Sequence, residues 1–228
     1  MLDWYRRDYA DFNAACMREQ YLFLSGQKPR LEIAPVYERY SDLFARDAID
    51  RLKQHLADTP PHFETERAAL RRLLTFAVEQ FLENEVKELT ESISEHEAAT
   101  GIEWRGSELT FQDAVVAMAS ERDRDARRSL YQKRLTVIAA ANDLRADRLT
   151  KLHEQAGALG HASYKALFES LHQQNYTQLA REAAAVLQQT EAVYTTQLSN
   201  TLQRDLAVHI HEAERADCAY FTHLRGYD

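Results

Sequence analysis

Histidine–glutamate pairs are the residues of this 228-residue sequence that most suggest chemistry. There are three such dipeptides: His96-Glu97, His153-Glu154 and His211-Glu212. A zinc peptidase of the His-Glu-x-x-His type needs a second imidazole one helical turn later, so that both rings reach one metal ion while the glutamate activates water. Thr100, Gly157 and Arg215 occupy that second position. None of them supplies the missing imidazole, so we expect no catalytic residues of this type.

The densest group of potential metal ligands consists of His209, His211 and Glu212. On a helix, residues two positions apart point about 200° from each other, so the two imidazoles can share a metal only if the segment is extended. The segment joins two expected helices and is free to be extended. We keep these three residues as the candidates for a metal site, while expecting no cofactor.

Nucleophilic and phosphate-binding motifs are missing from the sequence. It contains no Gly-x-Ser-x-Gly element, which would place a serine on a strand–turn–helix elbow, and no glycine-rich phosphate loop. Cys16 falls on the apolar stripe of the first expected helix, where a packed thiol is the usual finding. The sequence therefore leans away from an enzyme.

The charge balance argues against nucleic acid as a partner. The formal net charge is −8 and the isoelectric point is about 5.6. Basic residues do cluster at positions 121–128, but acidic residues alternate with them. Alternation of this kind is typical of a solvated helix face with local ion pairs, so we expect no polybasic binding patch.

The amino-terminal residues, the lack of long apolar runs and the two cysteines indicate the cellular compartment. The first ten residues contain no apolar signal-peptide core, and no run approaches the roughly 20 apolar residues needed to cross a bilayer. Two cysteines, Cys16 and Cys218, make neither a disulfide framework nor a zinc cluster. We expect a cytoplasmic protein with no membrane partner.

Few turn-forming residues are available to any fold of this length. With only 6 Gly and 4 Pro, the chain favours long helices over strands. Apolar periodicity and capping residues, such as Asp123 and Ser163, place helices at about 2–25, 35–57, 64–100, 111–120, 124–158, 164–171, 177–206 and 212–224. Residues 101–109 alternate in polarity around Gly106 and predict a small turn or hairpin. The expected fold is all-α, an elongated bundle of about six to eight helices.

The expected packing faces follow from the same periodicity. In the helix at 177–206, for example, we expect one inward stripe, built on Leu179, Ala183, Val186, Val193, Leu198 and Leu202. No low-complexity linker divides the chain. We expect one helical domain over 1–228, made of a helical hairpin at 1–61 and a long-helix body at 62–228.

From about Leu89 onward, the order of features resembles the amino-terminal helical half of the zinc peptidases related to oligoendopeptidase F and thimet oligopeptidase. The residues that carry the resemblance are 102–110, 119–128, Tyr131, Asn142, Arg148, the turn at 159–164 and the closing segment 215–228. In that family the helix with His-Glu-x-x-His and the third zinc ligand lie further along than this chain extends. No zinc ligand or catalytic glutamate is carried over to any position here.

The resemblance implies a fold rather than an activity. In the family, this half forms one wall of a deep substrate cleft. A chain with that wall alone would expose apolar surface, so we expect a homo-oligomer or a complex with a separate catalytic chain, and a peptide is a further candidate ligand. Two alternatives stay open: an independent helical interaction or regulatory module, and a metal-dependent hydrolase whose site is not recognised by motif.

Overall fold

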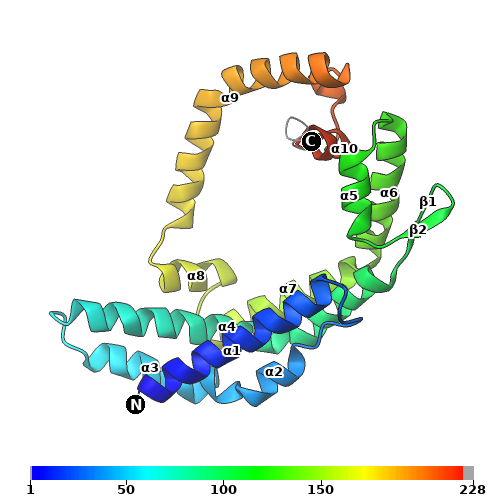
Figure 1. Ribbon diagram of the computed structural model, residues 1–228. Helices are drawn as coiled ribbons and strands as arrows, with labels where there is room; N and C mark the ends of the chain where they lie inside the picture. The colour runs from blue at the N-terminus through cyan, green and yellow to red at the C-terminus, as the bar shows by residue number, and fades with distance from the viewer. Residues whose placement is uncertain (1, 223–228) are drawn as a thin grey trace. The chain divides into compact units, whose positions relative to one another are not determined.

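The computed structural model describes residues 2–222, with side chains described from Tyr5 onward. The prediction of an all-α fold is confirmed. Over the described residues there are ten α-helices, two short 3₁₀ helices and one two-stranded sheet. Figure 1 labels most of these elements along the chain. None of the described helices combines the length and apolar character needed to cross a membrane.

The helix count exceeds the expected six to eight because two predicted helices are each divided. The stretch at 35–57 contains α2 (Ala34–Arg39), the 3₁₀ helix η1 (Ser41–Leu43) and α3 (Arg46–Asp58). The stretch at 124–158 contains α6 (Arg124–Ala140) and α7 (Asn142–Ala158), separated at Ala141. Phe44 lies in the short break between η1 and α3, and its aromatic ring is almost fully buried in the core.

The chain forms two compact units. Unit 1 comprises Met1–Glu95 and Asp143–Asn175, and unit 2 comprises His96–Asn142 and Tyr176–Asp228. The expected hairpin at 1–61 lies inside unit 1, together with residues that follow it. The expectation of a single helical domain stays a prediction.

Unit 1 is built from α1 (Leu2–Leu24), α2, η1, α3, most of α4 (Glu64–Ala99), most of α7 and α8 (Tyr164–His172). Aromatic rings join its first helices: Phe12 makes edge-to-face contacts with Tyr37 and Phe76, at centroid distances of 5.2 and 5.8 Å. Tyr5 adds a hydrogen bond of 2.5 Å from its hydroxyl to the carbonyl of Leu43. These contacts fix α1 to α2, η1 and α4.

Polar contacts align α7 with α4 in unit 1. Arg148 of α7 donates two hydrogen bonds from Nη2 to the carboxylate of Glu83, at 2.9 and 2.7 Å. Its Nε donates to the hydroxyl of Thr90, about two helical turns after Glu83 on α4. A charged fork that reaches two points on the same helix sets the register of the two helices.

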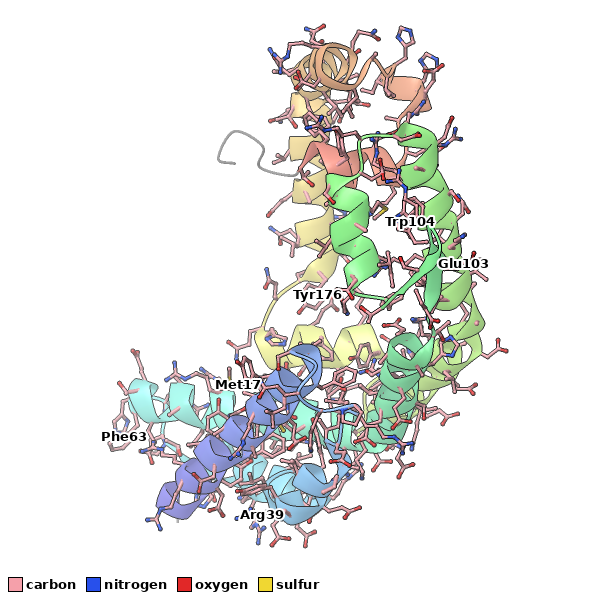
Figure 2. All side chains as sticks on the ribbon, turned by 45° about the vertical axis from the view of Figure 1, so that its right-hand side comes forward. Met17, Arg39, Phe63, Glu103, Trp104 and Tyr176 are labelled. Carbon is pink, nitrogen blue, oxygen red and sulfur yellow. The ribbon has the colours of Figure 1, made fainter. Side chains whose placement is uncertain are left out.

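Unit 2 contains the hairpin that the sequence predicts. Strands β1 (Ile102–Trp104) and β2 (Ser107–Leu109) pair antiparallel, with Ile102 opposite Leu109. Both turn residues, Arg105 and Gly106, have positive φ, at 50° and 80°. This is the backbone of the two-residue turns that match the twist of a hairpin. Figure 2 shows the side chains of Glu103 and Trp104 on β1.

The rest of unit 2 is helical. Its elements are α5 (Asp113–Ser120), α6, α9 (Tyr176–Leu206), the 3₁₀ helix η2 (Ile210–Glu212) and α10 (Arg215–Phe221). Helices α5, α6 and α10 pack together, as Figure 1 shows. Their core contains Ala114, Leu130 and Ala216, which are fully buried.

Candidate functional site

The candidate metal ligands lie at the short segment between α9 and α10. His209 is extended and His211 lies within η2, and both are exposed. Their imidazole rings stack nearly parallel, with centroids 5.5 Å apart and an interplanar angle of 15°. Across residues 2–222, no group of three or more His, Cys, Asp or Glu side chains is arranged to hold a metal ion. The structure thus brings the two rings together but adds no third ligand from Glu212.

One glutamate–histidine pair contradicts the expectation that no helix carries a Glu-x-x-His motif. Glu169 and His172 on α8 have this spacing, which places two potential ligands on one helix face. In the structure, His172 Nε2 lies 3.2 Å from a carboxylate oxygen of Glu79 on α4, while Glu169 pairs with Lys165. These partners make the pair part of the contact between α8 and α4, and not a metal site.

The thiol of Cys16 lies in a setting that suppresses reactivity. Burial, together with the nearby negative charge of Glu19, raises its pKa to about 11. Because the thiolate is the nucleophilic form, a cysteine with such a high pKa is unreactive near neutral pH. The expectation of a packed thiol agrees with this setting.

The most buried charges of the described chain meet in unit 2, at Asp217 of α10. Its carboxylate is fully buried and accepts hydrogen bonds from Arg127 Nη2 at 3.0 Å and from Arg124 Nε and Nη2 at 3.1 Å. It also accepts a bond from the backbone N–H of Glu214, at 3.0 Å. Burial by itself raises the pKa of Asp217, but these hydrogen bonds outweigh it and leave the pKa below its ordinary value.

Arg127 is buried as thoroughly as its partner. Its Nη1 donates to the carbonyls of Glu121 and Arg122, and its guanidinium lies 4.2 Å from the ring centroid of Tyr220. The prediction of a solvated face at 121–128 is therefore wrong for Arg127, because a carboxylate from α10 draws it inward. Asp217 thus pairs with both arginines of α6, and Arg127 also lies over Tyr220 of α10, so we interpret the cluster as the contact that holds α10 on α6.

A wide apolar face on α9 is the feature most suited to binding. At 100° per residue, Leu179, Val186, Leu187, Val193 and Tyr194 fall within an arc of about 120° on the helix. All five side chains are exposed, from 43 % for Leu179 to 69 % for Leu187. The predicted apolar stripe is present, but the expectation that it packs inward is wrong for its members Leu179, Val186 and Val193. Only Leu202 of α9 is buried.

The same helix is poor in charge. Between Glu182 and Arg204, its only charged residue is Glu191. The remaining positions are alanine, larger apolar residues and uncharged polar residues. An exposed helix normally carries charged residues on its solvent side, whereas the centres of protein–protein interfaces are depleted of them. Helix α9 thus has the composition of an interface; Figure 2 labels Tyr176 at its start.

Comparison with known proteins adds no assignment to this site. The chain matches no protein-family model, no curated protein and no solved structure. The resemblance to the amino-terminal half of oligoendopeptidase F stays a prediction from the sequence.

Proposed function

We propose that this chain is a non-catalytic helical domain that associates with a second copy of itself through α9. The observation that carries the proposal is the exposed face of Leu179, Val186, Leu187, Val193 and Tyr194 on a helix with few charges. An exposed apolar patch of this kind typically marks an interaction surface.

The charge distribution on α9 favours a second copy as the partner. Glu182 and Arg204 lie eleven residues before and after Val193, and they fall about 40° apart around the helix. Consider two copies of α9 that pair antiparallel about a two-fold axis at Val193. Glu182 of each copy then lies level with Arg204 of the other copy, that is, at the same height along the helix pair. The remaining central charge, Glu191, then lies level with Thr195. Arg181 of each copy lies level with Asp205 of the other, next to the ion pair that Asp205 makes with Arg204 in its own helix. In this register, opposite charges meet and like charges do not.

In this register, Val193 and Tyr194 of the two copies meet at the two-fold axis and supply the apolar contact. The contact is small, so the proposal predicts a dimer that forms only as the concentration of the chain rises.

Sedimentation velocity over a concentration series tests the proposal. The wild-type chain should rise from 26.3 kDa toward twice that mass. Val193→Glu places two carboxylates together at the two-fold axis and should leave a monomer at every concentration. Val116→Glu is the matched control, because Val116 on α5 is also 68 % exposed but lies outside the α9 face. This control should dimerise as the wild type does.

The outcomes separate the candidate partners. A wild-type chain that stays monomeric at high concentration, or a dimer that survives Val193→Glu, contradicts the proposal. If the monomer instead forms a stable complex with a separate peptidase catalytic chain, and Val193→Glu weakens that complex, the partner implied by the family resemblance replaces the second copy.

A further inference from the structure

Unit 1 contains a pocket that the proposed association does not use. It has a volume of about 200 Å³ and lies between α3, α4 and the segment around α8. Its apolar wall includes Val78, Leu159 and Leu167, all of which are buried. Ligand pockets for whole drug-sized molecules measure about 300–1,000 Å³. This pocket therefore suits a small molecule or one end of a larger one.

Every ionisable side chain that lines the pocket is a base. These residues are Lys53 of α3, Arg71 of α4 and His161, and no aspartate or glutamate lines it. The chain has 36 acidic residues, 28 lysines and arginines and 9 histidines, and none of the acidic residues lines this pocket. Thr75, Ser170 and Gln173 add uncharged hydrogen-bonding groups to the lining.

The two permanent cations lack a counter-charge. Within the described part of the chain, neither Lys53 nor Arg71 has a hydrogen-bond or ion-pair partner. Arg71 is also half-buried, and a partly desolvated cation is stabilised by an anion that reaches it. An apolar wall beside unpaired cations is suited to a ligand with a hydrocarbon part and one negative end.

We propose that this pocket, here called the basic pocket, binds the carboxylate end of an aliphatic acid. The carboxylate lies between Lys53 and Arg71, and the hydrocarbon chain contacts the wall of Val78 and Leu167. Two sources share this chemistry: a free aliphatic acid and the carboxyl terminus of a peptide with an apolar last residue. The inference does not depend on the α9 interface, which lies in unit 2.

Titration followed by NMR on the full chain tests the assignment. Hexanoate should shift the resonances of residues around the basic pocket and saturate. Hexanol, which has the same chain without the charge, should bind at least tenfold more weakly. Each methylene added from butanoate to hexanoate should tighten binding about fourfold, as burial of a methylene group predicts. Equal binding of hexanoate and hexanol, or no saturable shift, overturns the inference.

Matched variants locate the ligand. Arg71→Gln should weaken hexanoate binding severalfold, and Lys53→Gln together with Arg71→Gln should weaken it further. Arg72→Gln is the control, because Arg72 is the next residue on α4 but is exposed and does not line the pocket. Equal effects of Arg71→Gln and Arg72→Gln would show non-specific charge attraction and overturn the assignment. Unchanged melting temperatures exclude misfolding as the cause.

Two peptide probes then distinguish the sources. Tri-leucine with a free carboxyl terminus is compared with the same peptide carrying a carboxyl-terminal amide. Tighter binding of the free-carboxyl peptide than of hexanoate, with loss on amidation, assigns the pocket to peptide ends. Binding of hexanoate with no binding of either peptide assigns it to free acids.

Discussion

Arg127 Nη2 donates a hydrogen bond of 3.0 Å to Asp217 Oδ1 although 90 residues separate the two in the chain. Both side chains are almost completely removed from solvent, at 2 % and 0 % exposure. A buried ion pair is costly to assemble, but removal of one member is costlier still because the other charge is left without a partner. This pair therefore makes α10 necessary to the stability of unit 2.

Asp217→Asn should destabilise unit 2 by about 3–5 kcal/mol, because the amide leaves the buried guanidinium of Arg127 without a counter-charge. Urea denaturation followed by circular dichroism measures the loss. Asp125→Asn is the control: this side chain is 92 % exposed and its ion pair with Arg128 is long, at 3.8 Å. The control should change stability by less than about 0.5 kcal/mol, and an equal loss in both variants would contradict the role given to the buried pair.

The lowered pKa of Asp217 predicts how stability depends on acid. The folded-state pKa lies below the ordinary value of 3.8, so the carboxylate contributes its full stabilisation above about pH 4 and loses it as the pH falls through the folded-state value. Denaturation curves measured from pH 7 down to pH 2 should show this loss in the wild type. The Asp217→Asn variant has no such carboxylate, so its dependence on pH should be shallower. Parallel curves would show that other carboxylates cause the acid sensitivity.

The two-fold arrangement of α9 predicts a charge reversal. Glu182→Arg places two arginines level with each other at both ends of the helix pair, and should weaken the dimer about two- to tenfold, as expected for exposed ion pairs. Adding Arg204→Glu restores opposite charges across the pair. The double variant should therefore dimerise more tightly than Glu182→Arg alone, as measured by sedimentation equilibrium at low salt. If the double variant is weaker than either single variant, the antiparallel register is wrong.

Local features of the fold were predictable because short-range chemistry decides them. Asp123 was expected to begin a helix, and its carboxylate accepts hydrogen bonds from the backbone N–H groups of Asp125 and Ala126. Ser163 does the same for Ala166 at the start of α8. The hairpin followed from alternating polarity around Gly106. In each case, the residues that determine the structure lie within a few positions of one another.

The candidate sites depended on contacts that the sequence does not display. Alternating charge around Arg127 indicated a solvated face, because no residue close to Arg127 in the sequence shows that Asp217 packs against it. The period of α9 predicted an apolar stripe but not that its members Val186 and Val193 would stay exposed. Similarly, Lys53 and Arg71 come from different helices, and only the fold brings them to one pocket. Periodicity predicts which side of a helix is apolar, whereas the residues that pack against that side are determined by the tertiary structure.

The distance in sequence between Arg127 and Asp217 has a consequence during synthesis on the ribosome. Translation at about 5–20 residues per second leaves roughly 5–18 seconds between the appearance of the two residues. For that interval the nascent chain carries the arginine without its carboxylate, and α5 and α6 without the helix that covers them. Completion of unit 2 is thus a late event, and a ribosome that stalls before residue 217 would release a polypeptide with an open core, a natural target for chaperones and proteases.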